Sequence, residues 1–160
     1  MNKQVLITGA NSGLGFETAK ALLSKGYTVV MANRSRKKSR VALEALRTLG
    51  YGDRVTAMTL DLEDRTSIVE FVEEYLARFG APDILINNAG VFIPKLERTK
   101  NGVEKNFDIN YLGHFYLDSL LVPKMKEQGL VISLSSLAHK HKDADIYGAD
   151  FSFRRGSYCL

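Results

Sequence analysis

The chain has 160 residues, of which 45% are hydrophobic and 25% charged, so we expect one domain with a single sizeable core. No apolar run approaches the roughly 18 residues of a membrane span, and the first residues do not resemble a signal peptide. The single cysteine, Cys159, excludes an intramolecular disulfide. Together these features predict a cytoplasmic protein without a membrane span.

Runs of apolar and β-branched residues alternate along the chain with segments whose apolar residues recur at helical spacing. The predicted strands cover residues 5–8, 27–32, 55–60, 83–87 and 130–135, and the predicted helices cover residues 13–25, 35–49, 64–79 and about 102–126. Helices between successive strands require right-handed crossovers and a parallel sheet. We therefore predict an α/β fold with a doubly wound parallel sheet, strand order 3-2-1-4-5, in a single domain over residues 1–160.

A glycine-rich turn, Thr8-Gly9-Ala10-Asn11-Ser12-Gly13-Leu14-Gly15, joins the first predicted strand to the first predicted helix. Glycines permit a tight turn and let backbone N–H groups approach a pyrophosphate, toward which the new helix points its positive end. Glycines also gather in ordinary strand-to-helix loops, but three of them at this spacing and in this context favour a dinucleotide site. The candidate cofactor-binding residues of the turn are Thr8, Gly9, Asn11, Ser12, Gly13, Leu14 and Gly15.

A second motif, Asn-Asn-Ala-Gly at residues 87–90, ends the fourth predicted strand. Alone it would indicate a turn, since Asn and Gly tolerate left-handed backbone. Together, Thr-Gly-x-x-x-Gly-x-Gly and Asn-Asn-Ala-Gly resemble the signatures of the short-chain dehydrogenase/reductase family. The resemblance implies that Asn88, Ala89 and Gly90 lie close to the ribose of a nicotinamide cofactor.

Asp61 and Leu62 follow the third predicted strand. A matching Asp-Leu pair of the family faces the adenine ring, and its carboxylate accepts a hydrogen bond from the adenine amino group. The resemblance implies the same role here. Asp64 is a competing explanation for an acid at this place, since it is well placed to cap the next helix.

The resemblance also implies catalytic residues. Asn110 matches the family's Asn-x-x-Gly segment, in which the Asn bends the helix and holds a water of the proton relay; a solvated Asn is the alternative. Ser136 matches the family's catalytic serine, which would hydrogen-bond a substrate carbonyl, with Ser135 as the alternative. His114 receives no catalytic role, because a histidine on a largely apolar helix is more often simply hydrogen-bonded.

Two tyrosines compete for the family's Tyr-x-x-x-Lys motif. Tyr147 stands 11 residues after Ser136, but Phe151 occupies its lysine position. Tyr158 stands 22 residues after Ser136, and its lysine would fall two residues beyond Leu160. We choose Tyr158, because the longer gap and the Ser-Ser-Leu-Ala-His and Gly-His-Phe segments are similar to the retinol-dehydrogenase-like branch. The chain then looks shorter than a family member, and we expect it to lack C-terminal substrate-binding segments.

The residues after the second predicted strand indicate the cofactor. An acid there would accept from the ribose 2′-OH and repel a 2′-phosphate, whereas here Asn33 and Arg34 follow, and no acid occurs before Glu44. Arg34 can fork to a phosphate, with Arg36, Lys37 or Lys38 adding charge, so we predict NADP(H) rather than NAD(H). Five basic residues of this run are enough to account for the net charge of +4. They are Arg34, Arg36, Lys37, Lys38 and Arg40. A solvated basic face is the alternative, and no nucleic-acid partner is needed to explain the run.

These motifs combine into one interpretation: an NADP(H)-dependent oxidoreductase that interconverts a carbonyl and an alcohol by hydride transfer, with Tyr158 exchanging the proton. The resemblance implies an apolar small-molecule substrate such as a retinoid or steroid, no metal, and pairing into a homo-oligomer through the long helix. Two alternatives stay open. One is a truncated, non-catalytic dinucleotide-binding module, and the other is an interaction protein that uses the same fold.

Overall fold

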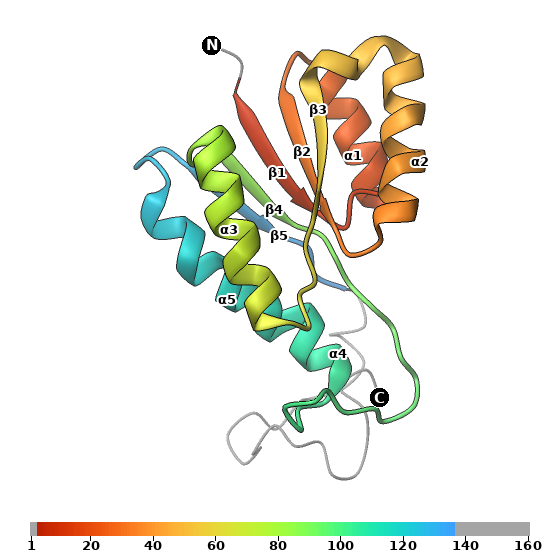
Figure 1. Ribbon diagram of the computed structural model, residues 1–160, viewed down its shortest axis with the longest axis vertical. Helices are drawn as coiled ribbons and strands as arrows, with labels where there is room; N and C mark the ends of the chain where they lie inside the picture. The colour runs from red at the N-terminus through yellow and green to blue at the C-terminus, as the bar shows by residue number, and fades with distance from the viewer. Residues whose placement is uncertain (1–2, 137–160) are drawn as a thin grey trace.

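The computed structural model describes residues 3–136, which form a parallel sheet with the strand order β3-β2-β1-β4-β5 (Figure 1). The strands are β1 (Gln4–Thr8), β2 (Thr28–Asn33), β3 (Val55–Thr59), β4 (Ile84–Asn87) and β5 (Leu130–Ser133). Every ladder between neighbouring strands is parallel. The predicted fold class and strand order are therefore confirmed.

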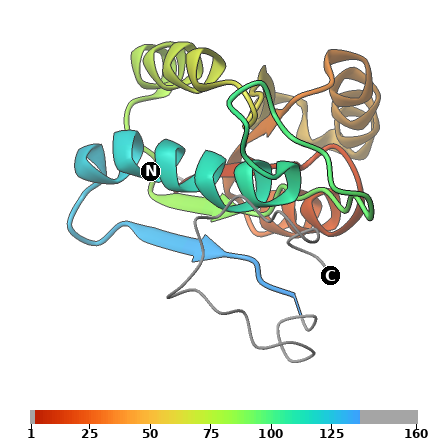
Figure 2. The ribbon, with the colours of Figure 1, turned by 90° about the horizontal axis from the view of Figure 1, so that it is seen from below.

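Helices connect the strands and cover the two faces of the sheet. They are α1 (Gly13–Ser24), α2 (Arg36–Leu46), α3 (Arg65–Phe79), α4 (Lys105–Phe107) and α5 (Gly113–Leu121). Figure 2, in which the molecule is seen from below, shows α1 and α2 on one side of the molecule and α3 and α5 on the other. Among the described residues, no helix is long and apolar enough to cross a membrane.

Alternate residues of the central strands enter two separate hydrophobic clusters. Leu6 of β1 packs in a cluster with Ile68 of α3 and Leu117 of α5. Val5 and Ile7, on the opposite face, pack in a cluster with residues of α1 and α2, among them Leu23. Successive side chains of a strand point to opposite faces, so a strand buried on both reads as a continuous apolar run.

The structure differs from the prediction mainly in the fourth helix. It begins at Lys105 rather than near residue 102, because Gly102 has a φ of +78° and closes a turn, after which Glu104 caps the helix through Phe107 N–H. A π-helical turn, Asp108–Leu112, then separates α4 from α5. At the other end a short 3₁₀ turn, Val122–Lys124, follows α5. The predicted helix 35–49 is likewise shorter, with α2 ending at Leu46 before a π-helical turn.

Candidate functional site

The residues singled out in the sequence gather at the carboxyl edge of the sheet, the lower end in Figure 1. Thr8 ends β1 and Asn33 ends β2. Asp61 comes shortly after β3, Asn88 directly after β4, and Ser136 shortly after β5. Because the strands are parallel, segments far apart in the chain lie side by side at this edge.

Two glycines of the turn allow close contact with the Asn-Asn-Ala-Gly segment. Gly9 has a φ of +67°, and a Cβ added there would lie 2.7 Å from the Cα atom of Ala89. A Cβ on Gly15 would overlap the side-chain amide of Asn88 and lie 2.7 Å from the carbonyl oxygen of Gly9. Any larger residue at either position would push the two motifs apart.

Gly13 is different, because it opens on empty space. Its φ is +56°, and an added Cβ would meet nothing within 4 Å. The residue before it, Ser12, is the N-cap of α1 but makes no side-chain hydrogen bond to the helix. The first N–H groups of α1 have no such capping partner, and a phosphate suits such a helix start.

The other helix starts at this edge are capped by their own side chains. Ser35 accepts from Lys38 N–H at α2, and Asp64 accepts from Thr66 N–H at α3. Asp64 is thus a capping residue, and the nearby Asp61 uses one oxygen to accept from Glu63 N–H at 3.1 Å. Leu62, between them, is buried in the core rather than exposed at the edge.

The hydroxyl of Thr8 joins the two motifs. Its oxygen accepts hydrogen bonds from the N–H groups of Asn88 and Ala89, both at 3.0 Å. In return, the side-chain amide of Asn88 donates to the carbonyl oxygens of Thr8 at 2.8 Å and Gly9 at 3.2 Å. A buried histidine, His114, lies 2.9 Å from the same hydroxyl, so the expectation that His114 is hydrogen-bonded is confirmed.

Two asparagines, Asn106 of α4 and Asn110 of the π-helical turn, hold the segment after β4 in an extended course. Asn110 accepts from Val91 N–H at 2.8 Å and donates to Val91 C=O at 2.9 Å. Asn106 does the same for Ile93, at 2.8 and 2.9 Å. Four residues of helix rise about 6 Å and two residues of strand span about 6.6 Å, so the spacings match.

The sequence analysis did not identify Asn106 as a site residue. The only signal for it in the sequence is its spacing of four residues from Asn110. Asn110 lies in the π-helical turn. Its side-chain amide bonds both backbone groups of Val91, and its backbone carbonyl oxygen lies 3.1 Å from Nδ1 of His114. The role of Asn110 in a proton relay stays a prediction. A few residues on, a Cβ on Gly113 would lie 2.5 Å from Leu62 O, so the helix needs a glycine there to pack.

The end of β2 carries an unusual side chain. Asn33 is 2% exposed, and neither atom of its amide has a hydrogen-bond partner among the described residues. Arg34, the next residue, is exposed. A buried amide without partners is costly, so Asn33 is suited to a polar ligand at this edge.

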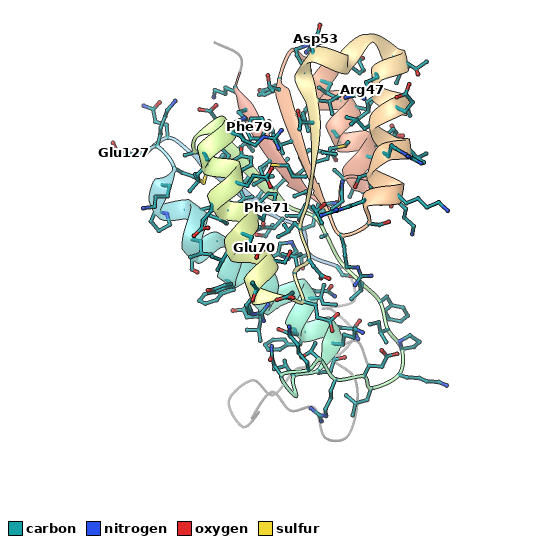
Figure 3. All side chains as sticks on the ribbon, in the orientation of Figure 1. Arg47, Asp53, Glu70, Phe71, Phe79 and Glu127 are labelled. Atoms are coloured by element: carbon teal, nitrogen blue, oxygen red, sulfur yellow. The ribbon has the colours of Figure 1, made fainter. Side chains whose placement is uncertain are left out.

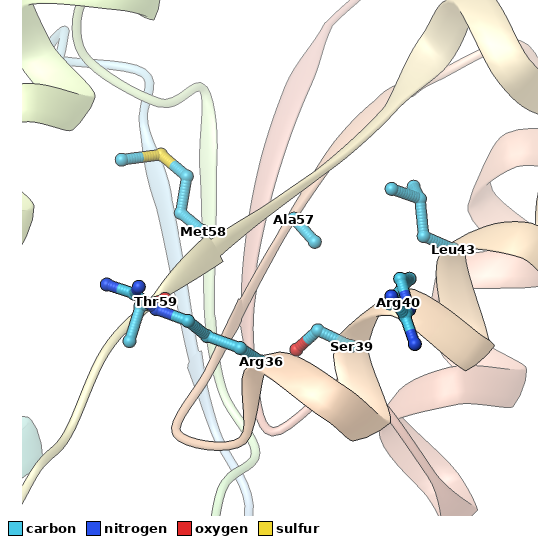
Figure 4. A pocket seen from close by; sticks show the side chains of 7 residues that line it. All are labelled: Arg36, Ser39, Arg40, Leu43, Ala57, Met58 and Thr59. Carbon is cyan, nitrogen blue, oxygen red and sulfur yellow. Dashed lines mark hydrogen bonds between the residues drawn. The ribbon is translucent and has the colours of Figure 1, made fainter.

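A pocket of about 290 Å³ lies near the basic run, between α2 and β3 (Figure 4). Its lining residues are Arg36, Ser39, Arg40, Leu43, Ala57, Met58 and Thr59. Arg36 crosses its rim and donates from Nε to the hydroxyl of Thr59 at 3.2 Å. Arg36 and Arg40 of the basic run line this pocket, but no residue of the glycine turn or of the Asn-Asn-Ala-Gly segment does, so it does not coincide with the dinucleotide site predicted from the sequence.

A second polar cluster lies between β4, β5 and α5. Asn87 donates from its side-chain nitrogen to both oxygens of Asp118, at 3.0 and 2.9 Å, and lies 3.3 Å from the hydroxyl of Ser133. Burial raises the pKa of the Asp118 carboxyl above its ordinary value, against the opposing effect of the Asn87 amide. Burial also lowers the pKa of His114, one helical turn away.

Only some of the predicted catalytic residues lie among the residues that the structure describes. Ser135 and Ser136 are exposed and follow β5. Tyr158 and its alternative Tyr147 lie outside the described residues. No group of His, Cys, Asp or Glu able to hold a metal ion occurs among residues 3–136.

Comparison with known proteins shows which family shares these motifs. Residues 3–149 match the family model described as short chain dehydrogenase. The chain is 42% identical over 139 residues to retinol dehydrogenase 12 of Mus musculus, covering 86% of this chain and 44% of that protein. It therefore spans about half the length of the curated relatives that it matches.

Solved structures agree in fold. A short-chain dehydrogenase/reductase, glucose/ribitol dehydrogenase from Brucella melitensis, matches with a TM-score of 0.76 and 26% identity, covering 89% of this chain and 60% of that one. L-sorbose reductase from Gluconobacter frateurii, solved with NADPH and L-sorbose, matches with a TM-score of 0.74 and 26% identity, covering 86% and 53%. The glycine turn, the Asn-Asn-Ala-Gly segment and these similarities lead to one conclusion. The chain belongs to the short-chain dehydrogenase/reductase family, in its retinol-dehydrogenase-like branch.

Proposed function

We propose that this chain carries the cofactor site of an NADP(H)-dependent oxidoreductase that interconverts a carbonyl and an alcohol. The observation that supports it most is the start of α1, where Ser12 leaves the helix uncapped and Gly13 opens on empty space. At the same place, Gly9 and Gly15 close on the segment after β4. An anion fits there, because backbone N–H groups and the helix dipole favour negative charge.

Each part of a dinucleotide would have its own residues. The N–H groups of the glycine turn, including those of Gly13 and Leu14, would hold the pyrophosphate. Asp61 has a second carboxylate oxygen for the adenine amino group. The segment from Asn88 to Gly90 would lie against a ribose, and its backbone is fixed by Thr8. A bound nicotinamide would supply the hydride chemistry.

The chain's own residues would manage the proton and the substrate oxygen. Ser136, exposed after β5, would donate a hydrogen bond to the substrate oxygen and orient it. Tyr158 would exchange the proton with that oxygen, which requires a phenol pKa below the usual value of about 10. Asn110 would support the relay. The similarity to retinol dehydrogenases favours an apolar alcohol or aldehyde as substrate.

The preference for NADP(H) is supported by charge. Arg34 is exposed directly after β2, and the first acid further along the chain is Glu44. A guanidinium binds a phosphate through two parallel hydrogen bonds and would favour the 2′-phosphate of NADP(H). An acid at this place would instead accept from a ribose hydroxyl and repel the phosphate.

The test is titration of the protein with NADPH and with NADH by calorimetry. We expect tighter binding of NADPH, and Arg34→Asp should reverse the order. The control is Arg47→Asp, the same change of charge at an exposed residue on the opposite, upper end of the molecule in Figure 3. Equal affinities for the two cofactors, or the same loss in both variants, would refute the preference.

The competing possibility, a dinucleotide-binding module without turnover, is separated from the enzyme by a second measurement. Oxidation of NADPH is followed by absorbance with a panel of apolar aldehydes and ketones, in the protein of natural length. Turnover that Tyr158→Phe abolishes while NADPH affinity stays unchanged supports the oxidoreductase. Binding without turnover supports the module. A cytoplasmic location and a homo-oligomer stay predictions.

A further inference from the structure

His114 is a buried titratable residue that the proposed chemistry does not use. It lies on α5, is 6% exposed, and spans two parts of the site. Its Nε2 lies 2.9 Å from the hydroxyl oxygen of Thr8, and its Nδ1 lies 3.1 Å from the carbonyl oxygen of Asn110. The ring thus connects the end of β1 with the π-helical turn.

The hydrogen-bond partners fix the state of the ring. A carbonyl oxygen only accepts, so the ring must carry a hydrogen on Nδ1 to bond Asn110. The Thr8 oxygen already accepts from two backbone N–H groups, those of Asn88 and Ala89, which fills its two lone pairs. Its own hydrogen must therefore be donated. Nε2 of His114 at 2.9 Å is the better acceptor, since the alternative, Ile86 O, is 3.5 Å away.

We propose that His114, as the neutral ring with its hydrogen on Nδ1, is a positioning residue of the dinucleotide site. By accepting from Thr8 it fixes the direction of that hydroxyl, so that both lone pairs face Asn88 and Ala89. These two residues then stay against Gly9, in the place where a ribose would lie. The inference rests on the proposed function in one respect only, namely that the ligand of the site is a dinucleotide.

Protonation of the ring would undo this arrangement. A charged ring donates from both nitrogens, and the Thr8 oxygen would then face three donors with two lone pairs. Burial lowers the pKa of His114, and the hydrogen bond to Asn110 and the carboxylate of Asp118 oppose that effect. Asp118, on α5 itself, is the charged group that faces the ring among the described residues; Thr8 of β1, packed against the ring, carries no charge.

The pH dependence follows from these contacts. The ordinary pKa of histidine is 6.5, and the folded value is lower. The neutral ring therefore supports the site fully above pH 6.5, and this support is lost as the pH falls through the lower folded value. Cofactor affinity should fall with it.

The test compares three proteins: the natural chain, His114→Leu and His114→Gln. Leucine removes the acceptor for Thr8, whereas glutamine places its amide oxygen near the position of Nε2 but does not titrate. NADPH affinity is measured by fluorescence titration from neutral to acidic pH. We expect His114→Leu to weaken binding about tenfold, the size of one hydrogen bond of about 1.4 kcal/mol, and His114→Gln to restore most of it.

The pH profiles sharpen the result. The natural protein should lose affinity on acidification more steeply than His114→Gln. Titration of the ligand's own phosphate affects both proteins equally, so it drops out when one pH profile is subtracted from the other. An unchanged affinity in His114→Leu, or identical pH profiles for the natural protein and His114→Gln, would overturn the proposal. If His114→Leu does not fold, the second comparison decides alone.

A ligand-free measurement separates this proposal from the proposed function. Amide hydrogen exchange at Asn88 and Ala89 is followed by NMR in the natural protein and in His114→Gln and His114→Leu. Faster exchange at these two amides in His114→Leu, restored in His114→Gln, supports the positioning role even if no dinucleotide binds. Failure of every protein to bind NADPH or NADH would refute the proposed function, and equal exchange rates would refute the role of His114.

Discussion

Strand β4 has two neighbours whose surroundings differ sharply. On one side, Val5, Leu6 and Ile7 of β1 are completely buried, and the two faces of the strand pack in separate hydrophobic clusters. On the other side, Leu130 and Val131 of β5 are 49% and 37% exposed. Both strands pair with β4 through regular parallel ladders. The difference therefore lies in side-chain burial and not in backbone pairing.

This contrast divides the candidate site. The glycine turn and the Asn-Asn-Ala-Gly segment follow strands that are packed on both sides, so the cofactor side has a rigid base. Ser136 follows β5, whose side chains are exposed on both faces. Strands of a parallel sheet are normally covered on both faces. We expect the cofactor side to be firmly held within these residues and the side of Ser136 to depend on further packing.

The largest expected effect is on the free energy of unfolding, and it comes from a pair of residues that stand opposite each other in the ladder between β4 and β5. Leu85 is fully buried and stands opposite Val131 in the ladder. Leu85→Ala should lower the free energy of unfolding by about 2–5 kcal/mol, because it removes buried methyl groups and leaves a cavity. Val131→Ala should cost clearly less than about 1.5 kcal/mol, since the valine already contacts water. Urea denaturation measures both, and equal losses would show that β5 is packed in solution.

The asparagine pair of the fourth helix should show the next largest effect. Asn106→Ala or Asn110→Ala removes two hydrogen bonds between the side-chain amide and the backbone of Ile93 or Val91, which costs about 1–3 kcal/mol. Asn101→Ala, at an exposed position in the preceding turn, is the matched control and should change stability little. Thermal unfolding of the three variants gives the comparison. Losses no greater than the control's would mean that water replaces these amides.

The sequence predicted the strands and their order well, because buried parallel strands and glycine turns leave local signals. It also placed Asp64 as a cap, since capping depends on residues a few positions away. It missed Asn106, whose partner Ile93 is a backbone group across a loop, and no local pattern encodes such a contact. Likewise the contacts of this segment with Val91, through Asn110, and with Leu62, through Gly113, join residues far apart in the chain, and periodicity alone does not contain them. The exposure of β5 was also not foreseen, since its apolar run reads like a buried strand.

Two glycines near the two ends of α1, Gly13 at its start and Gly26 after its last residue, offer a matched pair of smaller effect. Gly13 and Gly26 have φ values of +56° and +90°, and neither would bring a new Cβ within 4 Å of another atom. Alanine at either position should lower stability by a similar amount, about 1–2 kcal/mol, through backbone strain alone. Only Gly13→Ala should also weaken NADPH binding, because Gly13 lies at the helix start and Gly26 follows the far end. Titration and thermal unfolding distinguish the two effects, and equal NADPH binding by both variants would contradict a phosphate at the turn.

The smallest expected effect concerns two carboxyl groups that lie at opposite ends of β4, Asp83 before its first residue and Asp118 beside its last, Asn87. Asp83, before β4, accepts from Gln4 N–H of β1 at 2.8 Å, and this hydrogen bond is the main cause of its lowered pKa. Asp118 lies on the β5 side, where burial raises its pKa. The two groups must therefore influence stability with opposite signs as the pH changes.

The sign follows from proton binding in each state. Asp83 stabilises the fold fully above pH 3.8, its ordinary pKa, and this contribution is lost as the pH falls through the lower folded value. The folded protein holds a proton on Asp118 above pH 3.8, so stability falls as the pH rises through the raised folded value. Asp83→Asn should therefore cost most at neutral pH and least in acid. Asp118→Asn should be best tolerated at neutral pH and cost relatively more in acid.

Urea unfolding of both variants and the natural protein at pH values from acid to neutral gives the two difference curves. Parallel curves would mean that the two carboxyl groups have the same electrostatic environment, against the opposite directions of their pKa shifts.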